Sequence, residues 1–350
     1  MKKTRYALCV ALLLVCAIVS IAYGADTRVY TFRLDSVDPV TSIATVGLQR
    51  FVDNVHEKSN GRIQIVPFWG ATLGAFTDNY DNLLLGISDI AWSSAPLYAG
   101  RMPVYEGGAL PMLGVQNTVA ATRMLWEMFE TSEELQSDFD NVKVLALHAT
   151  GFYTILSARK PIDVTSFAGS TVRVSGIIPN LFITALGGTP VTITSGEVYE
   201  SVQRNIVDMI SWDWSGLTNY ALYEQIRYGG SIGYSYGVQY LLMNLDSYNS
   251  LPDDLKAVID ECSGEALSHS IAEDWQRQNK IASELCIENG VEIVQFTEDM
   301  IQVWQEAAST VHSQWIELMN QAGYDGAKIV EDYKALAAKW NAVYPFGFYE

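Results

Sequence analysis

Cysteine and histidine are scarce in this 350-residue sequence, with four residues of each. The histidines are scattered along the chain, at His56, His148, His269 and His312. They have none of the spacings of a zinc site, and no nucleophile motif, phosphate-binding loop or dinucleotide fingerprint is present. We therefore expect no metal, no cofactor and a binding protein rather than an enzyme, because binding needs only shape and a few polar groups.

Basic residues are also few, with 22 Lys and Arg against 40 Asp and Glu and a formal net charge of −18. Such a surface repels nucleic acid and anionic membranes and keeps the protein in solution. The same field is unfavourable for an anionic ligand. A carboxylate would therefore have to be captured by local groups rather than by long-range attraction.

The first 24 residues have the pattern of a secretory signal: a basic start, an apolar run over residues 6–21 and small residues before Ala25. We expect cleavage after Gly24, a periplasmic location and no direct membrane insertion of the mature chain. Removal of three basic and no acidic residues changes the net charge from −18 to −21. A membrane anchor would need about 20 apolar residues, and a lipoprotein at Cys16 is disfavoured by the bulky Val15 before it.

Two cysteines remain in the mature chain, Cys262 and Cys286, and an exported protein could pair them. The pattern over residues 252–289 predicts one continuous helix that contains both. Twenty-four residues of helix would separate the two thiols by about 36 Å, far beyond disulfide reach. We therefore predict that both are unpaired.

The most informative segment, residues 169–214, has the pattern strand, helix, strand, helix, strand. Its first strand, 171–174, alternates β-branched residues around a single arginine, Arg173. Its last strand, 206–210, is followed by Ser211, Trp212, Asp213 and Trp214. Open α/β sheets bind ligands at the carboxyl ends of their strands, so this segment predicts a binding site.

Arg173 has two interpretations. Its guanidinium stays charged at any working pH and presents a planar fork that matches a carboxylate, so it could anchor an anionic ligand. A buried arginine in a protein also commonly pairs with a carboxylate of the protein itself. The pattern alone leaves both interpretations open.

Longer motifs accompany this arginine: RVSG at 173–176, LGGTP at 186–190, SGEVYESVQ at 195–203 and VD at 207–208. The segment resembles the signature of the solute-binding proteins of tripartite ATP-independent periplasmic (TRAP) transporters. Gly196 and Met209 depart from that signature. The resemblance continues through 60–63, 73–74, 86–90 and 110–111 and covers essentially the whole mature chain.

The resemblance implies an α/β fold of two lobes, a Venus flytrap with mixed sheets and a long helix bridging both lobes. A second strand-helix-strand-helix-strand pattern over residues 29–92 agrees with a two-lobed chain. We expect lobe I to comprise residues 25–149 and 238–278, and lobe II to comprise residues 150–237 and 279–350.

In the family the arginine that corresponds to Arg173 binds the ligand carboxylate. Trp212 stands where many members have an asparagine, and Tyr153 stands where sialic-acid-binding members have a second arginine. Trp92 is a pocket wall or a core residue, and Asp78 a pocket acid or a solvated first-turn residue. The candidate ligand-binding residues are Arg173, Trp212, Asp213, Tyr153, Trp92, Asp78, Phe152, Trp214 and Tyr236.

These residues predict capture of a small aromatic or hydrophobic carboxylate by an arginine–carboxylate pair, followed by lobe closure and delivery to the membrane permease. Asp213 could accept a hydrogen bond from the ligand or pair with Arg173 in the empty state. A periplasmic sensor of a receptor system would share this sequence. An enzyme is the remaining alternative, with Asp213 and Asp78 as its titratable pair.

Overall fold

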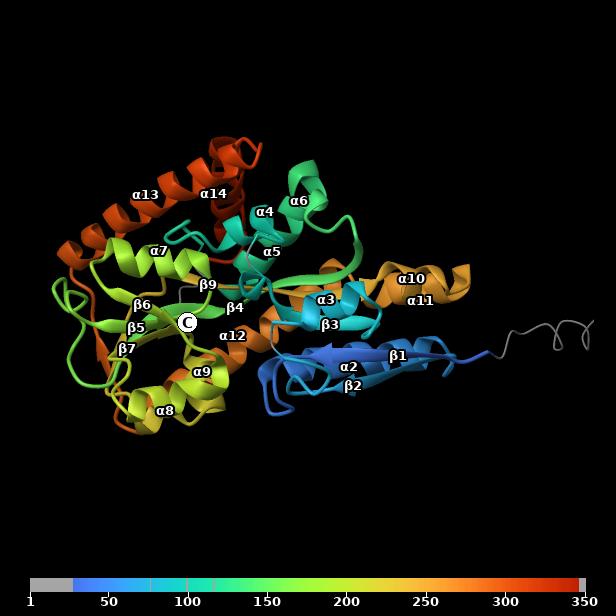
Figure 1. Cartoon of the computed structure of the whole chain (residues 1–350), viewed down its shortest axis with the longest axis horizontal. Coiled ribbons are helices and arrows are strands. Elements are labelled where there is room, and N and C mark those ends of the chain that lie inside the picture. The colour runs from blue at the N-terminus through green and yellow to red at the C-terminus, as the bar shows by residue number, and fades with distance from the viewer. Residues whose placement is uncertain (1–27, 76, 99, 116, 346–350) are drawn as a thin grey trace, which may run out of the picture.

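The computed structural model describes residues 28–345 except residues 76, 99 and 116. The predicted signal, its cleavage site and Cys16 lie outside the described residues. Helices flank a central set of strands on several sides, and the described chain has the two-lobed α/β architecture that the sequence predicts (Figure 1).

The strands of the described residues form one mixed sheet with the path β2-β1-β3-β9-β4-β7-β5-β6, in which β8 pairs with β4 and β10 pairs with β8. Their bounds are β1 (Tyr30–Ser36), β2 (Ile63–Phe68), β3 (Ile90–Ser94), β4 (Val142–Ser157), β5 (Thr171–Val174), β6 (Thr189–Thr192), β7 (Met209–Trp212), β8 (Tyr228–Gly230), β9 (Ser235–Asn244) and β10 (Glu292–Val294).

The helices surround this sheet. Their bounds are α2 (Ile43–Lys58), α3 (Asn79–Leu84), α4 (Pro103–Glu106), α5 (Thr118–Thr131), α6 (Glu133–Ser137), α7 (Ile177–Ala185), α8 (Val198–Gln203), α9 (Trp214–Asn219), α10 (Leu245–Asn249), α11 (Asp253–Cys262), α12 (Glu265–Glu288), α13 (Glu298–Gln321) and α14 (Gly326–Val343). Short 3-10 helices are η1 (Ala95–Leu97), η2 (Gly107–Ala109), η3 (Ser195–Glu197) and η4 (Leu222–Glu224).

Two long strands connect the lobes. β4 pairs with β9 as far as Tyr153 and, from Thr154 on, pairs with β7 of the second lobe. The register of β4 against β9 shifts between Ala149 and Phe152, close to the predicted crossing between lobes. α13 packs against α7, and α14 packs against α5, so the C-terminal helices contact elements on both sides of the predicted division. The lobe boundaries remain a prediction.

The helix α12 bridges the lobes, since it packs against α2 on one side and α9 on the other. The prediction of one continuous helix over residues 252–289 is wrong. The helix breaks at Gly264, whose φ of 80° is poorly tolerated by residues with a Cβ, and α11 and α12 are separate helices. Cys262 and Cys286 are nevertheless free, as predicted, because they are buried in different hydrophobic clusters.

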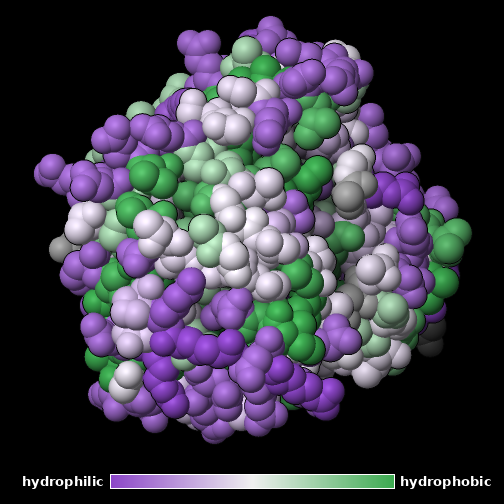
Figure 2. All heavy atoms as spheres, turned by 60° about the vertical axis from the view of Figure 1, so that its left-hand side comes forward, coloured by the Kyte–Doolittle hydropathy of each residue, from purple (hydrophilic) through white to green (hydrophobic). Residues whose placement is uncertain are grey.

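The molecular surface on the face seen in Figure 2 is mainly hydrophilic at its rim, and hydrophobic residues form separate patches between polar ones. Within the described part of the chain, no helix has both the length and the apolar character needed to cross a bilayer.

Candidate functional site

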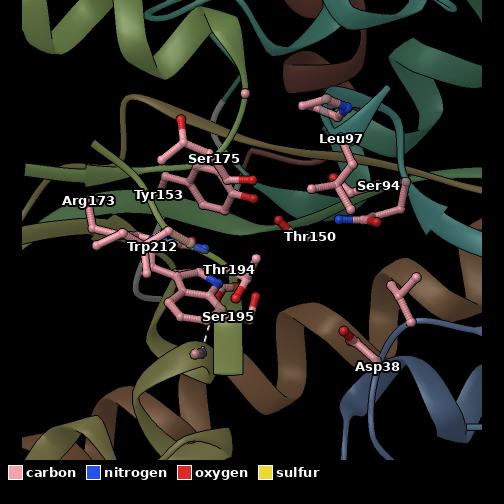
Figure 3. A pocket seen from close by; sticks show the side chains of 18 of the residues that line it. Asp38, Ser94, Leu97, Thr150, Tyr153, Arg173, Ser175, Thr194, Ser195 and Trp212 are labelled. Atoms are coloured by element: carbon pink, nitrogen blue, oxygen red, sulfur yellow. Dashed lines mark hydrogen bonds between the residues drawn. The ribbon is translucent and has the colours of Figure 1, made fainter. Parts of the chain in front are cut away.

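A cavity of about 530 Å³ lies between the two lobes. The loop after β1 and the end of β3, in the predicted lobe I, line one side, and the ends of β5 and β7, in the predicted lobe II, line the other. α12 and the long strands β4 and β9 complete it. Side chains from both sides face one another across this space, with Arg173 and Trp212 on one side and Asp38 on the other (Figure 3).

Arg173 is the buried cation of this cavity, with 3% of its surface exposed. Its Nε donates to the carbonyl oxygen of Ile193 at 3.0 Å, and no carboxylate of the described residues lies within ion-pair distance of it. Burial lowers the pKa of Arg173 to about 10, so the guanidinium remains charged at neutral pH. A buried charge without a counter-ion is costly, which favours an anion beside it.

Trp212 forms the surface on which Arg173 rests. The guanidinium carbon of Arg173 lies 4.3 Å from the centroid of the indole ring. The ring of Tyr220 contacts the same indole, with centroids 5.3 Å apart. Gly216 allows this arrangement, because a Cβ there would lie 2.5 Å from the indole. The tryptophan therefore fixes the arginine and adds an apolar face to the cavity.

Asp213 begins α9, and its Oδ1 accepts from the Ser215 hydroxyl at 2.8 Å and the Gly216 amide at 3.1 Å. Its Oδ2 is buried and has no hydrogen-bond partner of good geometry among the described residues. Burial raises the pKa of Asp213 to about 6, against the lowering effect of the hydrogen bonds from Ser215 and Gly216 and of the nearby Gly151 amide. One of the two roles expected for Asp213 was an ion pair with Arg173. The structure does not contain this ion pair.

Trp92 and Tyr153 also line the cavity. Trp92 is at the same time a core residue, because its Nε1 donates to Nε2 of His148 at 3.1 Å. Burial lowers the pKa of His148 to about 4, so this histidine is neutral and structural, as its isolation in the sequence indicates. Burial raises the pKa of Tyr153 far above its usual value, and its hydroxyl stays protonated.

Four candidate residues do not line the cavity. Phe152 packs against Tyr236 with ring centroids 5.1 Å apart, and the Tyr236 hydroxyl donates to the Gly108 carbonyl. Trp214 is buried in the hydrophobic cluster of lobe II. Asp78 is exposed before α3, where its carboxylate accepts from the Ala75 amide and the Thr77 hydroxyl.

Asp78 and Asp213 therefore do not share a site, and the acid pair of the enzyme alternative is not brought together. The described residues also contain no group of three or more His, Cys, Asp or Glu side chains arranged to hold a metal ion.

The structure adds lining residues that sequence reasoning missed: Asp38, Ser94, Thr150, Ser175, Thr194, Ser195, Tyr220, Gln239 and Trp275. Asp38 keeps some exposure to the cavity, but protein atoms surround it and burial raises its pKa to about 6. Its Oδ2 accepts from the Ser42 hydroxyl at 2.6 Å. Asp38 and Ser94 come shortly after predicted strand positions, so the rule of strand carboxyl ends could have found them. Trp275, in the middle of a helix, has no such signal.

A cavity between two lobes with a buried cation and aromatic walls defines a protein that binds small molecules. Residues 35–318 match the family model of bacterial extracellular solute-binding proteins, family 7, and the chain belongs to this family.

Several relatives are similar over almost their whole length. The ectoine/5-hydroxyectoine-binding periplasmic protein of Ruegeria pomeroyi is 22% identical, over 92% of this chain and 95% of the relative. A marine metagenome TRAP solute-binding protein specific for aromatic acid ligands, solved with metahydroxyphenylacetate, has a TM-score of 0.85 at 25% identity, covering 89% of this chain and 99% of that one.

A third relative is the TRAP solute-binding protein of Rhodoferax ferrireducens, solved with copurified benzoate. It has a TM-score of 0.82 at 26% identity, covering 90% of this chain and 99% of that one. The first of these relatives is a periplasmic binding protein, and the two solved structures are TRAP solute-binding proteins. The chain is accordingly a TRAP solute-binding protein and not an enzyme.

Proposed function

We propose that this protein captures a small organic acid with an aromatic or hydrophobic body and delivers it to the membrane permease of a TRAP transporter. The observation that carries the proposal is the buried guanidinium of Arg173, which faces the cavity without a carboxylate partner among the described residues. A monocarboxylate would supply the missing counter-ion through two parallel hydrogen bonds.

The walls of the cavity support an apolar ligand body. Trp92, Tyr153, Trp212, Tyr220 and Trp275 line it from both lobes. Aromatic faces favour a flat ring over a polyhydroxylated sugar acid, because a sugar needs many more hydrogen-bond partners. The neighbours solved with metahydroxyphenylacetate and benzoate support the same ligand class.

In this proposal, the closure of the two lobes around the ligand is the change that the permease recognises. The ligand contacts Arg173 in lobe II and Trp92 in lobe I, so it stabilises the closed form through contacts that the open form lacks. The hinge lies where β4 and β9 cross between the lobes, at the predicted boundaries near residues 150 and 237. The mature, periplasmic chain begins at Ala25 after cleavage behind Gly24, and the permease recognises its closed form.

A thermal-shift screen of carboxylic acids on the mature chain tests the proposal. A ligand at 100 times its dissociation constant should stabilise the protein by about 2.7 kcal/mol. We expect a clear increase in Tm with benzoate or phenylacetate and none with benzamide or phenylacetamide, which have the same rings but no charge. Equal shifts with acids and amides, or no shift with any aromatic acid, would contradict the proposal.

A further inference from the structure

Three polar atoms on residues that line the cavity are buried without a hydrogen-bond partner of good geometry among the described residues. They are Oδ2 of Asp213, Oε1 of Gln239 and Nε1 of Trp275. Each residue is more than nine-tenths buried, with exposed fractions of 1%, 6% and 5%. Buried polar groups are nearly always hydrogen-bonded, so three unsatisfied groups around one cavity indicate a missing partner.

Asp213 reaches this region from the start of α9. A Cβ on Gly151 of β4 would lie 2.7 Å from Asp213 Oδ2 and 2.6 Å from Asn279 Oδ1. Asn279 belongs to α12, one turn after Trp275, and its Oδ1 accepts from the Ser215 amide at 3.1 Å. The free carboxylate oxygen of Asp213 therefore lies where β4 passes α12, on the helix face that also carries Trp275.

Gln239 belongs to β9 and lines the same part of the cavity. A Cβ on Gly237 would lie 2.5 Å from the Tyr153 hydroxyl and 3.0 Å from Gln239 Nε2. The side-chain amide of Gln239 and the hydroxyl of Tyr153 therefore both lie close to Gly237 of β9. Residues of β4, β9 and α12 form this part of the cavity wall, whereas Arg173 enters the cavity from β5.

We propose that Asp213, Gln239 and Trp275 form a second polar subsite that binds a hydroxyl group of the ligand, which makes the ligand a hydroxylated aromatic monocarboxylate. The subsite offers two acceptors, on Asp213 and Gln239, and one donor, on Trp275. A ligand hydroxyl accepts from the Trp275 Nε1 and donates to one of the two acceptors, whereas an ammonium group could only donate and a carbonyl could only accept. This inference rests on the proposed function, because the carboxylate of the same ligand is held by Arg173.

The charges around the subsite exclude a second carboxylate. Asp213 lies at the subsite itself, and Asp38 faces the cavity close enough for its charge to act on Asp213. A dicarboxylate would place a second anion beside these acids with a single buried arginine to balance it. A neutral hydroxyl satisfies the free Oδ2 of Asp213 without adding charge.

Calorimetric titration of the mature protein with matched acids tests the subsite. The probes are phenylacetate, metahydroxyphenylacetate and its meta-methoxy ether, which accepts but cannot donate. We expect the hydroxylated acid to bind at least roughly tenfold more tightly than phenylacetate, and the ether to bind no better than phenylacetate. Equal affinity for all three would overturn the subsite but leave the proposed function standing.

Failure of all three acids to bind would instead contradict the proposed function. Ectoine is a further probe, and if it bound more tightly than the hydroxylated acid, the assignment of the subsite to a hydroxyl would be overturned.

Three variants locate the effect. Gln239→Met and Trp275→Phe keep the size of the side chain and remove its polar atom, and Asp213→Asn replaces one carboxylate oxygen by an NH₂ donor. Each should lower the ratio of the two affinities, the hydroxylated acid over phenylacetate, from roughly tenfold towards one. Asp213→Asn should in addition bind both acids more tightly, because it removes a negative charge from the cavity. Trp126→Phe, outside the cavity, is the control and should leave this ratio unchanged. Equal weakening of both acids in all three subsite variants would assign them a merely structural role.

Discussion

Gly176 of lobe II lies directly against Pro96 of lobe I, so closely that a Cβ on Gly176 would be 2.5 Å from the Cβ of Pro96. Both residues line the cavity, one before α7 and the other in η1. The φ of Gly176 is 89°, a value that other residues rarely adopt. The contact therefore joins the two predicted lobes beside the cavity and depends on a residue without a side chain.

Gly176→Ala should weaken ligand binding by holding the lobes apart. We expect the dissociation constant to increase by roughly tenfold or more, because about 1.4 kcal/mol of lost closure energy has this effect. Titration measures the affinity, and small-angle scattering with saturating ligand should show a larger radius of gyration than for the wild type.

Gly187→Ala is the matched control for this substitution. Its φ of 84° imposes a similar backbone strain, but nothing lies within 4 Å of the added Cβ. It should lower stability without changing affinity. An unchanged affinity in Gly176→Ala, or an equal loss in both variants, would contradict a role for the contact in closure.

Ligand affinity should increase as the pH falls through about 6. Burial raises the pKa of Asp38 and of Asp213 to about 6, so both are mostly ionised at pH 7.5 and mostly protonated at pH 5.5. An anionic ligand raises these pKa values further, so binding takes up protons and is stronger at low pH. Phenylacetate itself remains ionised over this range.

Asp38→Asn should reduce this dependence, because it removes one charge and keeps an acceptor for Ser42. Titrations at pH 5.5 and 7.5 should give a difference of up to roughly tenfold in the wild type and a smaller one in the variant. A wild-type affinity that increases with pH would be the opposite result and would exclude these acids as its cause.

Glu106 should make the protein less stable at alkaline pH. Glu106 is buried, its Oε1 has no hydrogen-bond partner, and burial together with the charge of Asp138 raises its pKa from 4.5 to about 8. Because the folded-state pKa is the higher one, its stabilising contribution is complete below pH 4.5 and is lost as the pH rises through about 8.

Glu106→Gln carries no charge at any pH and should remove this loss. We expect its Tm relative to the wild type to increase between pH 5 and pH 9 by at least roughly 2–4 °C, which corresponds to about 1 kcal/mol. Thermal denaturation at the two pH values measures the change. A difference in Tm that is the same at both pH values would show that folding does not raise the pKa of Glu106.

The strand that carries Arg173 could be predicted from sequence because its evidence is local. The alternating β-branched residues 171–174 coincide with β5, and the carboxyl-end rule placed Trp212 and Asp213 in the cavity. The break at Gly264 was missed because a single glycine within a helical pattern is tolerated in many helices. Only the left-handed backbone seen in the structure distinguishes it.

Other parts of the site depend on contacts between distant segments. Phe152 and Tyr153 are neighbours on β4, and successive side chains on a strand face opposite sides, so only one was suited to line the cavity. Gln239 and Trp275 both line the cavity although they belong to separate elements, β9 and α12. Their meeting is a property of the assembled lobes, and no local pattern specifies it.

Calorimetric titration of Arg173 variants with phenylacetate tests the central claim most directly. Arg173→Met removes the charge, Arg173→Lys keeps it without the planar fork, and Arg159→Met, which breaks a surface ion pair with Asp208, is the control. Both Arg173 variants should stay folded, since an unpaired buried charge does not stabilise the free protein. We expect that neither variant binds the acid at concentrations that saturate the wild type and the control. Wild-type affinity in either Arg173 variant would show that this arginine does not anchor the carboxylate.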